Sequence, residues 1–432
     1  MTILIKNGQV MLEQGLVQRD VLIKEDKIVN IAPHIEQIEC DTVVIDASHK
    51  VILPGFIDVH VHWREPGFEY KETIKTGSTA AARGGFTTAM PMPNLNPVPD
   101  TKENLQKQLN IIAQDSLIRA IPYGAITKGE LGEDLADFSD LAELGCFAFT
   151  DDGRGVQSAG MMYEAMQQAS KLGKAVVAHC EDNSLILGGC MHEGKRSHQL
   201  GLQGIPSVCE SVQIARDILL AEAANCHYHV CHVSTKESVR LVRDAKRAGI
   251  HVTCEVCPHH LLCNDMDITE NHGNWKMNPP LRDFSDQKAL IEGLEDGTID
   301  MIATDHAPHT LEEKNCCMSK AAFGIVGCET AFAQLYTAFV KTGRWSLKQL
   351  VDWMSIKPAQ VFQLPYGKLA IQSCADLTIV DLEKETVIDI DTFKSKGKNT
   401  PFHKRVVYGM PELTISRGKI AYQEESACLQ NN

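Results

Sequence analysis

Residues 55–67 read GFIDVHVHWREPG, and this stretch places several polar side chains at the end of an expected buried strand. An apolar run ends with His60 and His62, and Arg64 follows two residues later. Because alternate side chains of a β-strand share a face, both imidazoles point one way while the intervening apolar side chains point the other way. Such a pair can chelate one metal ion, although an isolated pair is equally compatible with hydrogen-bonded structural histidines. The rest of the chain decides between the two.

Short β-branched apolar runs recur from residue 51 onward and alternate with amphipathic helical stretches. This alternation is typical of βα units arranged around a parallel sheet. Eight such runs predict a (β/α)8 barrel of the TIM type. The expected strands span residues 51–62, 86–91, 118–124, 146–150, 175–179, 227–232, 251–256 and 301–304.

The two ends of the chain follow a different pattern, with short strands joined by tight turns. The economical arrangement is one small β-sandwich that both ends build together beside the barrel. We therefore expect residues 1–53 to form the N-terminal part of the sandwich, residues 54–365 the barrel, and residues 366–432 the C-terminal part.

Composition narrows the class of protein. The net charge of −14, without a basic cluster, argues against a nucleic-acid partner. The N-terminus lacks a signal-peptide pattern, and no apolar run approaches the roughly 20 residues of a membrane span. The fifteen cysteines show no disulfide framework, and the lone pair Cys254 and Cys257 is interpreted as structural. We expect a cytoplasmic protein with no membrane partner.

Ionisable residues follow the ends of the expected strands, at the rim where barrels of this type build their active sites. Because buried ionisable groups without partners are costly, their convergence favours a metal site over structural histidines. Imidazole and carboxylate ligands favour zinc, and four histidines with aspartates fit two ions about 3.5–4 Å apart. The candidate ligands are His60, His62, Asp151, Asp152, His179, His232 and Asp305.

A two-metal site needs a bridging anion, which Asp151 or Asp152 must provide; strand alternation alone does not choose between them. A hydroxide held between two cations attacks a carbonyl at neutral pH, so amide hydrolysis or its reverse is the expected reaction. Asp305 would carry the proton from the hydroxide to the departing nitrogen.

Further polar residues indicate the substrate. Arg64 offers a planar fork that matches a carboxylate. Asn94, Asn278 and His309 follow other strands near the same rim. Arg64 could instead hold a surface carboxylate, and each asparagine could simply shape a turn.

The chain resembles the dihydroorotases, specifically the bacterial class I enzymes of the cyclic amidohydrolase superfamily. The resemblance covers nearly the whole chain, and HVHWREPG together with TDHAPH is its most specific part. The stretches that carry it are GFIDVHVHWREPG, MPMPN, FTDDG, VAHCED, CHVST, CPHHL, MNPPLR, ATDHAPH and AFGIVGCET.

The resemblance implies two Zn²⁺ per chain and the reversible cyclisation of N-carbamoyl-L-aspartate to L-dihydroorotate in pyrimidine (UMP) synthesis. His60 and His62 would bind the first zinc with Asp305, and His179 and His232 the second, with Asp152 as the bridge. The substrate-binding residues implied are His62, Arg64, Asn94, Asn278, His309, Phe323 and Gly324, the last two through their backbone.

Several alternatives stay open at this point. Hydantoinases and allantoinases are similar in chemistry, but they bridge their metals with a carboxylated lysine, and CFAFTDDG contains none. An inactive scaffold homologue is a further alternative. A homodimer is expected, and association with aspartate transcarbamoylase stays open. The polar loop 310–322 is expected to close over the site.

Overall fold

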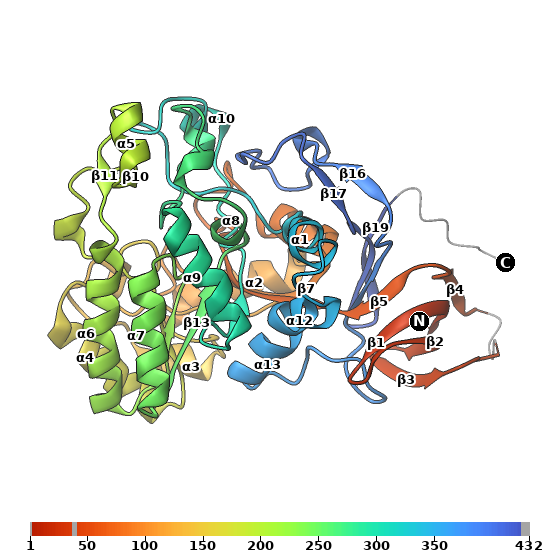
Figure 1. Cartoon of the computed structure of the whole chain (residues 1–432). Helices are drawn as coiled ribbons and strands as arrows, with labels where there is room; N and C mark the ends of the chain where they lie inside the picture. Colours follow the sequence, from red (N-terminus) through yellow and green to blue (C-terminus); the bar gives the residue numbers. More distant parts are fainter. Residues whose placement is uncertain (1, 37–40, 425–432) are drawn as a thin grey trace.

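Strands from both ends of the chain pair in one mixed sheet, at the right of Figure 1. The computed structural model describes residues 2–36 and 41–424, so the ends of the expected terminal segments lie outside the described residues. The strand order is β19-β18-β15-β5-β1-β2-β3, with β4 on β1. Apolar side chains from both ends, including Ile5, Ile52 and Ile415, share one core. The strands are β1 (Thr2–Leu12), β2 (Gly15–Lys24), β3 (Lys27–Ala32), β4 (Val43–Asp46), β5 (Val51–Pro54), β15 (Leu377–Val380), β18 (Pro411–Ser416) and β19 (Lys419–Gln423).

The middle of the chain forms parallel strand pairs, as the alternating pattern predicts. One run pairs β6-β7-β8 and another pairs β9-β12-β13-β14. Single bridges join Gly124 to Phe149 and Phe149 to Val176, and a bridge between Val61 and His306 brings the pairing back to β6. These strands are β6 (Phe56–Val61), β7 (Phe86–Pro91), β8 (Arg119–Ala120), β9 (Val176–Ala178), β12 (Tyr228–Val230), β13 (Val252–Val256) and β14 (Met301–Ile302).

The first expected strand, 51–62, is two strands in the structure. β5 belongs to the terminal sheet and β6 to the parallel strands, and Gly55 separates them. A Cβ at Gly55 would lie 2.2 Å from the Thr87 hydroxyl oxygen, so only glycine fits here. The Gly55 N–H donates to the Asp376 carbonyl at 3.0 Å, which connects the junction between β5 and β6 to the residue before β15.

Strand 86–91 is confirmed without change, whereas every later expected strand was too long. Residues 118–124 shorten to β8, 175–179 to β9, 227–232 to β12 and 251–256 to β13. Residues 301–304 shorten to β14, and residues 146–150 form only isolated bridges at Phe149 within the described chain. Beyond β14, the Thr304 backbone N–H and hydroxyl both donate to the carboxylate of Asp58 in β6.

Helices follow most of the parallel strands and cover them on the outside, at the left of Figure 1. Threonine and serine side chains cap several of them; Thr101, Ser158 and Thr235 each accept a hydrogen bond from the backbone N–H three residues on. None of the helices in the described ranges combines the length and apolar character needed to cross a membrane. Because parallel strands alternate with helices that cover them, the chain is a mixed α/β protein.

The helices are α1 (Ile74–Arg83), α2 (Lys102–Asp115), α3 (Phe138–Glu143), α4 (Ala159–Lys171), α5 (Lys195–Leu200), α6 (Val208–Ala224), α7 (Lys236–Arg247), α8 (Pro258–Leu262), α9 (Phe284–Glu295), α10 (Leu311–Lys314), α11 (Ala331–Leu335), α12 (Leu347–Val351) and α13 (Lys357–Val361). Two short strand pairs complete the fold: β10 (Met191–His192) with β11 (Gly204–Ile205), and β16 (Glu385–Val387) with β17 (Val406–Tyr408).

Candidate metal centre and active site

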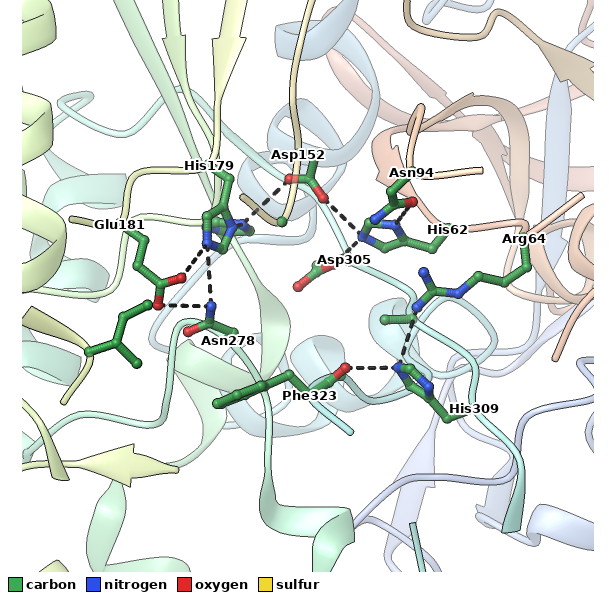
Figure 2. Close-up of a pocket in the computed structure, with 15 residues that line it drawn as sticks. His62, Arg64, Asn94, Asp152, His179, Glu181, Asn278, Asp305, His309 and Phe323 are labelled. Carbon is green, nitrogen blue, oxygen red and sulfur yellow. Dashed lines mark hydrogen bonds and ion pairs between the residues drawn. The ribbon is translucent and has the colours of Figure 1, made fainter. Parts of the chain in front are cut away.

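A cavity of about 350 Å³ opens among residues that follow the carboxyl ends of the parallel strands. Figure 2 shows its polar side chains pointing toward a common centre. Every expected site residue lines it except His60, which is fully buried beside it, and Asp151, one of the two candidate bridging ligands. The lining residues are His62, Arg64, Asn94, Asp152, Gly153, His179, Glu181, Ile186, His232, Asn278, Asp305, Ala307, His309, Phe323 and Gly324.

The histidines of β6 and the following loop meet two carboxylates. His60 Nε2 lies 3.3 Å from Asp152 Oδ1 and 3.5 Å from Asp305 Oδ1. His62 Nε2 lies 3.4 Å from Asp152 Oδ2 and 3.0 Å from Asp305 Oδ1. The structure thus brings these four side chains together.

A second pair of histidines adjoins the same carboxylate. His179 Nδ1 lies 3.0 Å from His232 Nε2, which is 3.9 Å from Asp152 Oδ1. Burial, together with His179 and His60, holds the pKa of His232 well below its ordinary value. A neutral imidazole has a free lone pair, which is the form that binds metals. Asp152 lies between the two histidine pairs.

The neighbouring aspartates have separate environments, which distinguishes the two candidate bridges. Asp151 Oδ1 accepts hydrogen bonds from the backbone N–H groups of Ile126 at 2.8 Å and Thr127 at 3.0 Å, and its Oδ2 accepts from the Thr127 hydroxyl. Asp151 therefore holds the loop after β8. Asp152, in contrast, faces the histidines.

The donor set fits a metal cation. His60 Nε2 and Asp152 Oδ1 are both buried, and although they lie 3.3 Å apart, neither makes a hydrogen bond to a described residue. Burial would raise the pKa of Asp152, but His60 and His62 hold it well below its ordinary value, so the side chain is a carboxylate. Unpartnered buried polar atoms are costly, and a bound cation would satisfy both.

Glu255 orients His60 from behind, and sequence reasoning missed it. Glu255 Oε1 lies 2.7 Å from His60 Nδ1, and its Oε2 lies 3.2 Å from His229 Nε2. Burial opposes ionisation of Glu255, yet His60 and His229 lower its pKa to about 2. A carboxylate on the far nitrogen of a ligating imidazole fixes the tautomer and orientation. Glu255 stands two residues after Thr253 in β13, so the two polar side chains share one face of the strand. This alternation is the signal that the sequence offered.

One wall of the cavity carries positive charge and backbone oxygens. An Arg64 guanidinium nitrogen lies 3.4 Å from His309 Nε2, and this ring nitrogen lies 2.8 Å from the Phe323 carbonyl (Figure 2). Asn94 Oδ1 lies 3.0 Å from His62 Nδ1. Asn94 therefore orients a candidate ligand.

The opposite wall contains Glu181, a second residue that sequence reasoning missed. Asn278 Nδ2 donates to Glu181 Oε1 at 3.0 Å, and Glu181 Oε2 lies 3.5 Å from His179 Nε2. Glu181 stands two positions after His179 in VAHCED, so a same-face position was the available signal. The cavity is thus acidic on one side and basic on the other.

The loop 310–322, expected to be an irregular polar segment, begins with α10 and is fastened to the cavity wall. Lys314, the last residue of α10, is 2% exposed. Its ammonium donates to the carbonyls of Lys276 at 2.9 Å, Ala322 at 2.8 Å and Gly324 at 2.7 Å. These bonds connect the loop to the backbone of an expected substrate-binding residue.

Two further groups outside the cavity have spacings compatible with metal ligands. Cys254 and Cys257 are both buried free thiols. Cys257 lies close to His259 and His260, and His192 lies close to Asp283 and Asp286. These are separate from the cavity residues in Figure 2.

Comparison with known proteins agrees with this geometry. A family model described as dihydro-orotase-like matches residues 49–238. A dihydroorotase of Fusobacterium nucleatum is 62% identical over 97% of this chain and 98% of its own length. The dihydroorotase of Bacillus subtilis strain 168 is 60% identical over 98% of this chain and 99% of its own.

Solved structures of related hydrolases share the fold. An L-hydantoinase (dihydropyrimidinase) from Arthrobacter aurescens has a TM-score of 0.89 at 29% identity, covering 99% of this chain and 97% of that one. A D-hydantoinase (dihydropyrimidinase) from Thermus sp. has a TM-score of 0.85 at 28% identity, covering 100% and 97%. The dihydroorotases are about twice as similar in sequence over nearly the full length. The chain therefore belongs to the dihydroorotase family.

Proposed function

We propose that this protein is a dihydroorotase that interconverts N-carbamoyl-L-aspartate and L-dihydroorotate in pyrimidine synthesis. One observation carries the proposal: a single cavity contains imidazole and carboxylate metal donors together with the Arg64 guanidinium, which lies 3.4 Å from His309 Nε2. The donors suit metal-assisted amide chemistry, and Arg64 suits an anionic substrate. The near-complete match to dihydroorotases supports the same reaction.

The proposed architecture is a closed (β/α)8 barrel with a small β-sandwich. The bridge between Val61 and His306 supports closure, and the terminal sheet supports a sandwich built from both ends. The proposed boundaries are 1–53 and 366–432 for the sandwich and 54–365 for the barrel.

Two zinc ions are the proposed cofactors. His60, His62 and Asp305 would hold one, His179 and His232 the other, and Asp152 would contact both; the unpartnered Asp152 Oδ1 supports this role. When bound, such ions lower the pKa of water and polarise the substrate carbonyl. A carboxylate in place of a carboxylated lysine makes the site independent of carbon dioxide.

The chain's own residues would orient the substrate and move the proton. Arg64, Asn94 and His309 would hold the substrate carboxylate, whereas Asn278 and the backbone at Phe323 and Gly324 would contact the ring. Asp305 would take a proton at its carboxylate from the attacking water and pass it to the departing ring nitrogen; its position on the cavity wall supports this.

The direct test is turnover of L-dihydroorotate and N-carbamoyl-L-aspartate by zinc-reconstituted protein, with hydantoin and allantoin assayed in parallel. Turnover of the first pair alone would support the proposal. Preferred hydrolysis of hydantoin or allantoin would favour the hydantoinase-like or allantoinase-like alternative. A folded, zinc-loaded protein without turnover of any substrate would favour the scaffold alternative.

The proposal retains three expectations about the cellular setting: a homodimer, association with aspartate transcarbamoylase, and a cytoplasmic location. Light scattering of the purified protein, alone and mixed with aspartate transcarbamoylase, measures the first two, and fractionation measures the third.

A further inference from the structure

A segment from the C-terminal part of the chain lies behind the cavity wall and bonds to two loops that line it. Asn399 lies between β16 and β17 and is 3% exposed. Its Oδ1 accepts a hydrogen bond from the His309 backbone N–H at 3.0 Å. Its Nδ2 donates to the carbonyls of Ala307 at 2.9 Å and Gly324 at 3.1 Å. One side chain therefore bonds to both loops that carry expected substrate contacts.

The chemistry of these contacts requires an amide. An asparagine side chain offers both an acceptor and two donors, and here it uses each of them. An aspartate of the same shape would accept from the His309 N–H but would place a carboxylate oxygen against two carbonyl oxygens. An alanine would leave one N–H and two carbonyls without this partner. The site is thus specific for asparagine.

The two loops meet at contact distance, which leaves little room for independent movement. Gly324 has a φ of +123°, and a Cβ there would lie 2.6 Å from the Ala307 Cβ and 3.3 Å from His309 Nε2. His309 Nε2 already lies 2.8 Å from the Phe323 carbonyl. Asn399 also accepts a hydrogen bond at its own backbone carbonyl from the Val326 N–H at 2.9 Å, so it holds this segment at Val326 as well as at Gly324.

We propose that Asn399 is a positioning residue for substrate binding: it sets the placement of His309 relative to the backbone of Phe323 and Gly324. The inference rests on the proposed function, because those groups are the ones proposed to hold the substrate carboxylate and ring. It assigns a role in substrate binding to a residue 75 positions beyond Gly324 in the sequence that does not itself line the cavity.

The test is steady-state kinetics of Asn399→Asp and Asn399→Ala with L-dihydroorotate. We expect KM to rise at least about tenfold in N399D, the factor that a loss of ~1.4 kcal/mol represents, with a smaller rise in N399A. The metal ligands are not disturbed, so kcat should change less than KM and zinc content should equal that of the wild type. Wild-type KM in both variants would overturn the inference.

Lys398→Met is the matched control in the same segment. The Lys398 ammonium donates to the carbonyls of Phe393 at 2.8 Å and Ser395 at 3.0 Å, so this change loosens the segment's own turn. We expect K398M to retain the wild-type KM. A rise in KM equal to that of N399D would mean that general loosening, and not the amide of Asn399, is responsible.

Hydrogen–deuterium exchange supplies a readout that needs no turnover. In zinc-loaded N399D and N399A, amides in peptides covering 307–310 and 323–327 should exchange faster than in the wild type. In both variants the side chain no longer donates to the Ala307 and Gly324 carbonyls, and in N399A the His309 N–H also loses its acceptor. If the wild-type protein does not turn over dihydroorotate, the proposed function fails while this exchange test still stands. Unchanged exchange in both variants would overturn the positioning role regardless of substrate.

Discussion

Replacing the adjacent residues Asp151 and Asp152 in turn should separate folding stability from metal binding. Asp152→Ala removes the carboxylate that lies 3.3 Å from His60 Nε2 and 3.4 Å from His62 Nε2. Replacing a residue that hydrogen-bonds to a metal ligand typically costs about 10–100-fold in metal affinity or activity. Loss of a direct ligand should therefore cost more. We expect zinc content to fall below two per chain and kcat/KM to fall by more than 100-fold.

Asp151→Ala should instead weaken the fold. It removes the acceptor of the Ile126 and Thr127 backbone N–H groups, bonded at 2.8 and 3.0 Å. A buried donor without a partner costs about 1–3 kcal/mol, so the two together should lower the free energy of unfolding by about 2–6 kcal/mol. Zinc content at saturating metal should remain that of the wild type.

Three measurements on the same preparations check this contrast: metal content by atomic emission, denaturant unfolding, and dihydroorotate turnover after zinc reconstitution. Asp151→Asn is the matched control, because one amide oxygen can still accept from both N–H groups; it should lose less stability than Asp151→Ala. Equal loss of zinc from the Asp151 and Asp152 alanine variants would refute the assignment of separate roles.

Four further perturbations have expected outcomes. Arg64→Lys keeps the charge but loses the planar fork, so kcat/KM should fall at least about tenfold without loss of zinc. Chelated protein should regain activity with zinc alone, and a requirement for added bicarbonate would contradict a carboxylate bridge. Lys314→Met removes three hydrogen bonds to backbone carbonyls and should raise KM and lower the unfolding midpoint. Burial raises the pKa of Asp286 to about 6, so the folded state binds its proton more tightly than the unfolded state and this group's contribution to stability falls as pH rises from about 4 to about 6. Relative to the wild type, Asp286→Asn should therefore gain stability over that range and keep the gain above it, measured by denaturant unfolding at each pH.

The approximate positions of the parallel strands and most of the candidate donors could be predicted because they depend on local pattern. Apolar runs with a period of two place the imidazoles after them on known faces, and parallel strands bring their carboxyl ends to one rim. His60, His62, His179 and His232 meet for this reason. The division at Gly55 was missed because a continuous apolar run carries no sign of which sheet each half joins.

Residues that act through long-range contacts were missed for a physical reason. Glu255 meets His60 across 195 positions, and Asn399 meets Gly324 across 75. A glutamate in an apolar strand and an asparagine in a turn-rich segment each have ordinary local explanations, so only the folded arrangement shows their partners. The choice between Asp151 and Asp152 has the same origin, because it depends on which loop offers backbone N–H groups.

On the proposed function, the charges of the cavity walls would also orient an anionic substrate. The protein carries a net charge of −14, so attraction would have to be local, from the two proposed cations and from Arg64 on the wall that includes His309. Glu181, on the opposite wall, would repel a carboxylate and would accept a hydrogen bond from a ring N–H. Attraction on one side and repulsion on the other discriminate between the two orientations more strongly than either effect alone. The ring amide is then directed toward the carboxylates and imidazoles at the centre of the cavity, where the proposed bond cleavage takes place.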